Sequence, residues 1–349
     1  MWKRSLLLGA LSALPLYAAG AEMAVMLPFS GPNAKAALAV RDGLVAAYYQ
    51  ASPEEKASTA LRFHDTPADR PLPPLFAAAV ERDTRAVIGP LLKEQVASVT
   101  AAPPDLPVLT LNRAGSAAHG VWQLSLSPDD EMPALARQLQ QDGIRRVSIL
   151  MGPDEASDRL RQAFIMAWEA ANGEVRSMHV LQDSKDGGIS AAFRQLLGGA
   201  GLGTAQALVV VTPGLTPQVQ TLLPYYRRTP LPVYTVSTAF DEEAPMVQRR
   251  DLDGVRLCSL PWNLGSRWAE NLVLHSIAPP ESGGYNRLMA MGGDAWQLAG
   301  MLPATRPVQI AARTGLINLD RDNLIRTPVC MEIQDGKAVE LPARNGQSR

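Results

Sequence analysis

The stretch Ala24-Val25-Met26-Leu27-Pro28-Phe29-Ser30-Gly31-Pro32 is a short apolar run that ends at a proline and a Gly-Pro pair. Apolar residues then recur at helical spacing, at Ala37, Val40, Leu44 and Ala47. This order predicts a buried strand, a tight loop and an amphipathic helix. A chain that repeats such a unit builds a parallel sheet covered by helices on both faces.

The same alternation of strand and helix patterns continues along most of the chain. We predict strands at 61–64, 85–88 and 106–111, and a second series at 146–151, 174–180, 205–211, 232–236 and 254–260. Because the two series are of similar size, they indicate an α/β protein with two lobes, each a mostly parallel sheet flanked by helices. The segments 314–319, 327–334 and 337–341 are typical of β-hairpins, with a turn at Asp335-Gly336.

Residues 1–21 have the features of a secretory signal peptide. Lys3 and Arg4 are cationic, the segment from Leu6 to Leu16 is apolar, and Ala19-Gly20-Ala21 resembles a cleavage site. The apolar segment is shorter than the ~20 residues that span a membrane, which favours cleavage near Ala21 over a retained anchor helix. No cysteine directly follows this apolar segment, where a lipid would be attached. We therefore expect an unlipidated protein that is exported to the periplasm.

Composition narrows the classes of partner. Removal of residues 1–21 leaves 328 residues, enough for two domains. The mature chain carries 31 Lys and Arg against 34 Asp and Glu, which argues against nucleic-acid binding and against a polybasic membrane patch. Its two cysteines, Cys258 and Cys330, allow one disulfide, with two buried free thiols as the alternative.

A binding site is expected in the loops that follow the strands, because ligands of open α/β sheets bind beyond the carboxyl ends of the strands. The candidate residues for a ligand or partner in the cleft are Ser30, Gly31, Leu91, Lys93, Asn112, Arg113, Ser116, Thr212 and Ser237. The guanidinium group of Arg113 is suited to binding a ligand carboxylate through two hydrogen bonds. The alternative is that Arg113 is an ordinary loop arginine in contact with solvent. Lys93 is expected at the start of a helix, and the alternative to a binding role is that it is simply exposed in the first turn.

No motif for catalysis, a metal or a cofactor accompanies these loops. Ser30 lacks the Gly-x-Ser-x-Gly context of a nucleophile elbow, and no nucleophile motif accompanies His64-Asp65. The four histidines are scattered without the spacing of metal ligands. The glycines at 199–203 precede a strand, whereas a dinucleotide-binding loop follows one. We therefore expect a protein that is not an enzyme and that holds neither a metal nor a cofactor.

Five segments follow one another in a characteristic order and together extend over nearly the whole mature chain. They are Ala24–Tyr49, Val87-Ile88-Gly89-Pro90-Leu91-Leu92-Lys93-Glu94, Leu124-Ser125-Leu126-Ser127-Pro128-Asp129-Asp130-Glu131, Arg287-Leu288-Met289-Ala290-Met291-Gly292-Gly293-Asp294-Ala295-Trp296 and Thr314-Gly315-Leu316-Ile317-Asn318-Leu319-Asp320. In this order they resemble the LppC family, the penicillin-binding-protein activators of Gram-negative bacteria. The segments that begin at Gly89 and Met291 are the specific ones, whereas the others fit any type I periplasmic binding protein.

The resemblance implies a two-lobed fold of the type I periplasmic-binding-protein kind, in which the chain crosses between lobes three times. It places residues 22–121 and about 260–303 in lobe one, and residues 122–259 and about 304–349 in lobe two. Family members known as activators are typically outer-membrane lipoproteins, and some carry a helical-repeat domain in front. Neither the lipidation cysteine nor that domain is found in this sequence.

The resemblance also implies a function. It suggests a non-enzymatic periplasmic protein that binds a class A penicillin-binding protein and regulates peptidoglycan synthesis. The alternative is a soluble solute-binding protein of a transporter, with a small polar ligand in the cleft between the lobes. Type I amino-acid receptors usually offer hydroxyl-bearing residues after the Gly-Pro pair, where this chain has Leu91-Leu92. That difference favours the regulator over an amino-acid receptor.

Overall fold

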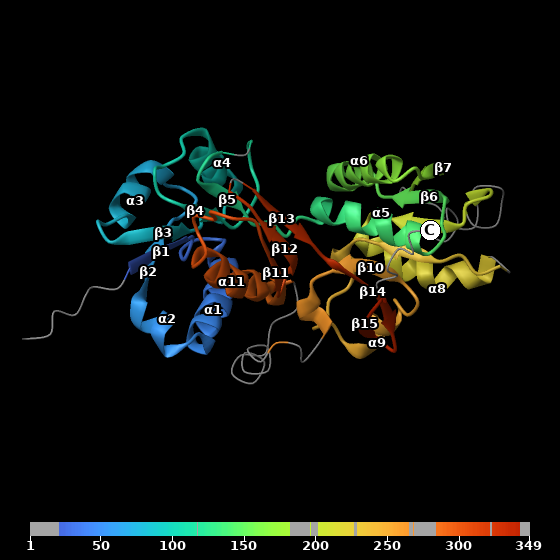
Figure 1. Cartoon of the computed structure of the whole chain (residues 1–349). Coiled ribbons are helices and arrows are strands. Elements are labelled where there is room, and N and C mark those ends of the chain that lie inside the picture. The colour runs from blue at the N-terminus through green and yellow to red at the C-terminus, as the bar shows by residue number, and fades with distance from the viewer. Residues whose placement is uncertain are drawn as a thin grey trace, which may run out of the picture.

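The computed structural model describes residues 21–116, 118–181, 196, 202–226, 229–264, 268, 284–321 and 323–342. They form two α/β lobes, which lie next to each other along the long axis of the molecule (Figure 1). The two-lobed α/β fold expected from the sequence is thus confirmed. The predicted signal peptide, up to residue 20, lies outside the described residues.

The first lobe contains a five-stranded parallel sheet with the strand order β2-β1-β3-β4-β5. Its strands are β1 (Ala21–Leu27), β2 (Thr59–Asp65), β3 (Thr84–Ile88), β4 (Val108–Thr110) and β5 (Val121–Gln123). Its helices are α1 (Ala34–Gln50), α2 (Pro53–Ser58), α3 (Leu72–Ala79), α4 (Lys93–Ala101) and, from late in the chain, α11 (Tyr285–Ala299).

Alternation along β1 explains why this sheet has helices on both faces. Val25 and Leu27 belong to the apolar cluster that includes α1 and α11, whereas Ala24 and Met26 belong to the cluster that includes α3 and α4. Successive side chains of a strand point to opposite faces, so a strand that is apolar at every position must be covered on both. The uninterrupted apolar run at the start of the chain therefore specifies a central strand.

The second lobe contains a seven-stranded sheet with the order β15-β14-β10-β9-β8-β6-β7. The strands are β6 (Arg146–Met151), β7 (Glu174–Val180), β8 (Ala207–Val210), β9 (Val233–Thr235), β10 (Arg256–Ser259), β14 (Val329–Gln334) and β15 (Lys337–Glu340). The strands from β6 to β10 are parallel, and β14 and β15 add antiparallel strands at one edge. The described helices of this lobe are α5 (Met132–Gln141), α6 (Glu155–Ala170), α8 (Thr216–Tyr226) and α9 (Met246–Arg250).

A three-stranded antiparallel sheet corrects the expected boundary between the lobes. Its strands β11 (Val308–Ala312), β12 (Gly315–Leu319) and β13 (Leu324–Thr327) lie in the range 304–349, which the sequence assigned to lobe two. Their buried side chains, among them Ile310, Ile317 and Leu324, instead belong to the core of the first lobe. Figure 1 shows these strands beside α11, toward the middle of the molecule. Of the late strands, β14 pairs with β10 and β15 pairs with β14, so these two join the second sheet.

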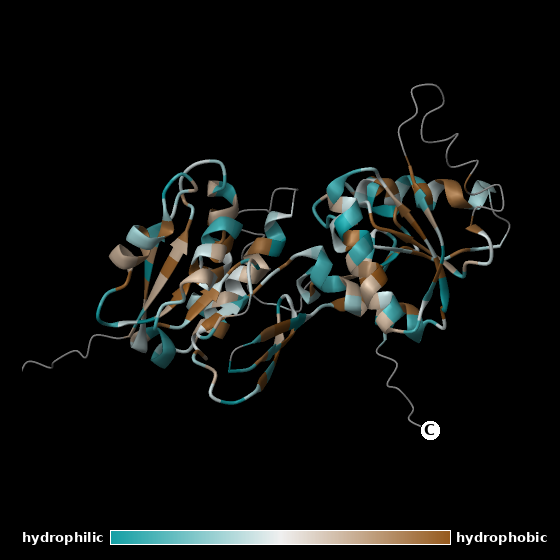
Figure 2. Cartoon of the chain, turned by 90° about the horizontal axis from the view of Figure 1, so that it is seen from above, coloured by the Kyte–Doolittle hydropathy of each residue, from teal (hydrophilic) through white to brown (hydrophobic). Residues whose placement is uncertain are grey.

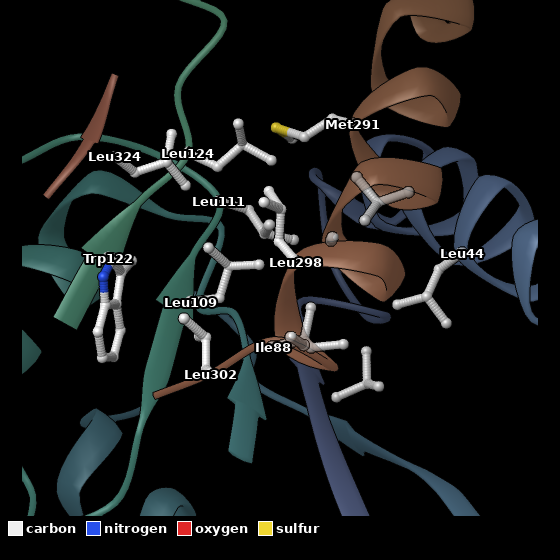
Figure 3. Packing of buried hydrophobic residues seen from close by; sticks show 14 of the residues in the cluster. Leu44, Ile88, Leu109, Leu111, Trp122, Leu124, Met291, Leu298, Leu302 and Leu324 are labelled. Atoms are coloured by element: carbon white, nitrogen blue, oxygen red, sulfur yellow. The ribbon is translucent and has the colours of Figure 1, made fainter. Parts of the chain in front are cut away.

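The core of the first lobe joins segments that are far apart in the sequence. Figure 3 shows side chains from α1, the strands β3 to β5, α11 and β13 converging on one apolar cluster. Trp122 and Leu124 are part of this cluster, so the first lobe extends a few residues beyond the expected boundary at 121. In Figure 2 the central strands of both lobes are mostly brown, whereas the helices carry more teal residues. Among the described residues, no helix is long and apolar enough to cross a membrane.

Glycines allow α1 and α11 to approach each other closely. A Cβ atom on Gly43 would lie 1.8 Å from the carbonyl oxygen of Met289, and one on Gly292 would lie 1.9 Å from that of Val40. No side chain fits at such distances, so both positions require glycine. The Met-Gly-Gly-Asp-Ala-Trp segment is therefore a helix-packing motif in this structure.

Asp294, in the same segment, fastens α11 to the three-stranded sheet. Its carboxylate is fully buried and accepts hydrogen bonds from the backbone N–H groups of Arg313 and Thr314, at 2.9 and 2.8 Å. The Thr314 hydroxyl donates a third, at 2.7 Å. Charge-assisted bonds of this kind offset the cost of burying a carboxylate.

Cys258 and Cys330 form a disulfide, which decides between the two alternatives left by the sequence. They face each other on the antiparallel strands β10 and β14 and are separated by 72 residues in the chain. The bond therefore fixes the late strand β14 to the parallel part of the second sheet. Free-thiol chemistry is excluded for both residues.

Candidate functional site

Ser30 and Gly31 lie in the loop after β1, where the sequence placed them. The backbone N–H and the hydroxyl of Ser30 donate to the two carboxylate oxygens of Asp65, at 3.1 and 2.6 Å. Gly31 has a φ of +78°, a conformation that favours glycine in a tight turn. Ser30 thus connects the ends of β1 and β2, and its hydroxyl hydrogen is already donated.

Leu91 and Lys93 do not contribute to a ligand site in the way expected. Leu91 is 8% exposed and packs in the core of the first lobe, so its inclusion among the cleft residues was wrong. Lys93 is exposed in the first turn of α4. Asn112 donates to the carbonyl oxygen of Leu91 at 3.1 Å and accepts from the backbone N–H of Arg113, and it therefore braces two loops.

Arg113 and Ser116 have different positions in the loop after β4. Arg113 is an exposed loop arginine that forms an ion pair with Asp130, at the start of the second lobe. Ser116 is exposed, and its backbone oxygen accepts from Gln123. The carboxylate partner of Arg113 thus belongs to the protein itself.

Thr212 connects two loops of the second lobe. Its hydroxyl oxygen accepts from the backbone N–H of Gly152 at 2.7 Å and lies 2.5 Å from the hydroxyl of Ser157. Ser157 also donates, through its backbone and its hydroxyl, to Asp154 at the N-terminus of α6. These two bonds lower the pKa of Asp154 below its usual value because they stabilise the charged carboxylate.

Ser237 is buried and contacts the other lobe. Its hydroxyl accepts from Nη1 of Arg287, in the first turn of α11, at 2.7 Å. The adjacent Asn286 donates to Glu242 of the second lobe at 2.7 Å and accepts from the indole N–H of Trp262 at 2.6 Å. Burial raises the pKa of Glu242, since the charged carboxylate loses water there.

Glu131 connects the lobes most directly. This residue precedes α5 in the second lobe and is 1% exposed. Its Oε1 lies 3.0 Å from Nη2 of Arg287 and 3.6 Å from Nη2 of Arg326, both of the first lobe. Arg326 also donates to the carbonyl oxygens of Ser125 and Thr314, at 3.0 Å each. Burial lowers the pKa of Arg326, but a guanidinium still keeps its charge and therefore needs this carboxylate.

These contacts form one polar network between the lobes. We call it the junction network, and its members are Arg113, Asp130, Glu131, Ser237, Glu242, Asn286, Arg287 and Arg326. Two members, Arg113 and Ser237, were named as candidates from the sequence. The others were missed, although Asp130, Glu131 and Arg287 lie in two of the family segments. Glu131, for example, pairs with Arg287, which lies more than 100 residues away in the chain. No local sequence pattern shows such a pairing.

Three pockets lie beside this network. The first, of about 400 Å³, is lined by Arg113, Asp129, Asp130 and Arg326 together with apolar residues. Two smaller ones, of about 300 and 290 Å³, share Glu242 and Asn286. Of the nine residues proposed from the sequence, only Arg113 lines any of the three. Within the described part of the chain, no cluster of three or more His, Cys, Asp or Glu side chains is suited to a metal.

Two lobes of mostly parallel sheet, joined by several crossings of the chain, define a protein of the periplasmic-binding-protein type. The sequence profile described as LppC putative lipoprotein matches residues 10–199 and 200–332, so this chain belongs to the LppC family.

Curated relatives carry the name penicillin-binding protein activator LpoA. That of Edwardsiella piscicida is 25% identical over 328 residues, which cover 80% of this chain and 46% of the relative. That of Yersinia pseudotuberculosis is 24% identical over 413 residues, which cover 93% of this chain and 61% of the relative. This chain therefore spans about half of the length of the curated relatives it matches.

Solved structures show the same fold. The C-domain of Haemophilus influenzae LpoA (YraM), described as a regulator of PBP1A, matches with a TM-score of 0.75 and 21% identity over 92% of this chain and 100% of that one. A putative branched-chain amino acid ABC transporter protein of Chromobacterium violaceum matches with a TM-score of 0.71 and 26% identity, over 89% and 99% of the two chains. The fold is thus shared by regulators and transport proteins, and it does not distinguish between them.

Proposed function

We propose that this chain is a non-enzymatic periplasmic protein that binds a class A penicillin-binding protein and regulates its peptidoglycan synthesis. The observation that carries the proposal is membership of the LppC family over nearly the whole chain, with curated relatives named penicillin-binding protein activator. The leader at residues 1–21 supports export to the periplasm.

The junction network supports a regulator over a transport receptor. In a solute-binding protein, ligand contacts with both lobes hold them closed around the bound solute. Here Arg287 already contacts Glu131 and Ser237 of the opposite lobe, and Arg113 contacts Asp130. Groups of the protein thus supply contacts that a ligand would otherwise make. A fixed arrangement of two lobes suits a protein that presents one composite surface to a partner.

The loop of Ser30 supports a non-enzymatic role. In a Ser-His-Asp triad the histidine lies between the serine and the carboxylate and removes the serine proton. Here Ser30 donates directly to Asp65, at 2.6 Å. The carboxylate thus takes the place that the histidine base occupies in the triad, and it orients the hydroxyl.

The direct test uses the mature chain, tagged at its carboxyl end, and a detergent-solubilised class A penicillin-binding protein from the same bacterium. Binding is measured by biolayer interferometry, and the rate of glycan polymerisation is measured with and without the chain. We expect saturable binding and a changed rate. Absence of both, with several synthases of the bacterium, would refute the proposal.

A solute-binding role is the second candidate, and one observation favours it. Asp130 and Arg326 line the pocket of about 400 Å³, and each has a buried polar atom, Oδ2 and Nη2 respectively, without a hydrogen bond. A thermal-shift series with the twenty common amino acids, each at 10 mM, tests this role. A ligand at one hundred times its Kd stabilises a protein by about 2.7 kcal/mol, which is readily measured.

A further inference from the structure

A groove on the first lobe lies apart from the junction network. It occupies about 810 Å³, roughly twice the volume of the pocket beside Arg113. The segment before β4 and the segment after α11 form its walls, and residues at the starts of β3 and β5 complete it. The groove therefore lies at the amino ends of the strands. The loops that contact the second lobe, such as that of Arg113, follow the carboxyl ends, at the opposite edge of the sheet.

The walls of the groove are rigid and largely apolar. Pro103, Pro104 and Pro107 form one wall, and Pro303 contributes to the other. Proline has a fixed φ and little conformational freedom to lose, so a surface built from it is preorganised for binding. Trp122 also lines the groove, is only 2% exposed, and donates its indole N–H to the carbonyl oxygen of Asp320 at 2.8 Å.

The rim of the groove carries two arginines. Arg85 and Arg321 line it and are exposed, and within the described residues neither guanidinium group has an ion pair or a hydrogen bond. Asp105 is the one carboxylate residue of the lining, and Asp320 accepts from the backbone N–H of Arg321. The rim is thus cationic, although the whole chain has a net charge of −1.

Met301 and Val308 flank the segment of Pro303 in the sequence and are each 40% exposed. An apolar, proline-walled groove with unpaired arginines at its rim matches an extended peptide that has apolar side chains and carboxylates. The two guanidinium groups also attract an acidic segment before contact and speed its association.

We propose that this groove is the docking site for an extended acidic segment of the partner synthase, an inference that rests on the function proposed above. The segment places apolar side chains between the proline walls and its carboxylates against Arg85 and Arg321. This segment of the partner contacts the first lobe, away from the junction network, which remains intact in the complex.

The test is the binding measurement described above, with the double variant R85E/R321E. We expect its Kd for the solubilised class A penicillin-binding protein to rise at least tenfold at 100 mM salt, since attraction at the rim becomes repulsion. The control, R137E/R145E, makes the same change of charge at two exposed arginines of the second lobe and should bind within twofold of wild type. All four sites are exposed, and circular dichroism confirms that both variants are folded.

The outcomes separate the two proposals. If wild type binds the synthase and R85E/R321E binds equally well, the groove is not the docking site and the proposed function stands. If wild type does not bind, the proposed function itself fails. A second measurement replaces Thr305 by photoreactive p-benzoyl-phenylalanine and identifies the cross-linked segment of the synthase by mass spectrometry. An excess of Asp and Glu in that segment supports the inference, and a basic or neutral segment overturns it.

Discussion

Exchange of Glu131 for glutamine tests whether the junction network holds the lobes together. The carboxylate is 1% exposed, and its Oε1 lies 3.0 Å from Nη2 of Arg287 and 3.6 Å from Nη2 of Arg326. Glutamine has nearly the same size but no charge. Glu131→Gln therefore leaves two arginines buried without the carboxylate that they share.

The expected loss of stability follows from this geometry. Removal of one partner of a buried ion pair costs about 3–5 kcal/mol, because the remaining charge is desolvated without compensation. The amide oxygen of glutamine still accepts one hydrogen bond. Arg287 also keeps its bond to Ser237, and Arg326 keeps two bonds to backbone carbonyls. We therefore expect the lower end, a decrease of about 3 kcal/mol in the free energy of unfolding.

Urea unfolding followed by tryptophan fluorescence measures this loss, with two transitions fitted if the lobes unfold separately. The matched control is Asp129→Asn, two positions earlier, which removes a half-exposed ion pair with Arg159 and should cost less than about 1 kcal/mol. The double variant E131Q/R287M should be less destabilised than the sum of the single variants, by at least about 1 kcal/mol. If E131Q is no less stable than the control, the lobes are not held together by this carboxylate.

Three further predictions concern single elements. Asp154→Ala removes the N-cap of α6 and should cost about 1 kcal/mol at pH 7, whereas Asn should cap as well as Asp. Because the folded-state pKa of Asp154 is lowered, its stabilising effect is present above its unfolded pKa and is lost as pH falls through the folded pKa. Urea unfolding between pH 5 and 2 should therefore show wild type converging with Asp154→Ala and becoming less stable than Asp154→Asn, which does not titrate. Gly292→Ala forces α11 away from α1 and should lower the melting temperature by several degrees. The control Gly300→Ala, with no atom within 3.5 Å of the new Cβ, should leave the melting temperature unchanged. Equal melting curves for the two variants would contradict the packing argument. The double variant C258S/C330S should lose about 2–5 kcal/mol, and unreduced wild type should show no mass increase with iodoacetamide under denaturing conditions.

The strands were predictable wherever they are buried on both faces. The predicted strand 146–151 has the bounds of β6, and 85–88 lies within β3 (Thr84–Ile88). Such runs are mostly apolar, because helices cover both faces of the sheet. The three-residue strand β5 was not recognised, since it is too short to show any periodicity. The predicted segments 314–319, 327–334 and 337–341 correspond to β12, β14 and β15, whereas β11, β13 and the lobe in which β12 packs were not recognised.

The candidate site was predicted only in part. The rule for open α/β sheets led to the loops that contain Arg113 and Ser237, which do contact the opposite lobe. It could not show that their partners are Asp130 and Arg287. It also included Leu91, whose side chain turns out to be part of the core.

The sequence by itself determined the two α/β lobes, the central strands and the family, because apolar periodicity, turn residues and segment order are properties of neighbouring residues. Tertiary structure alone decided that Cys258 faces Cys330, that β11 to β13 complete the first lobe, and that Glu131 neutralises Arg287 and Arg326. It also decided that Arg85 and Arg321 lie on the same groove. Each of these contacts joins residues that are far apart in the chain, and only the packing of sheets and helices brings such residues within a few ångströms of each other.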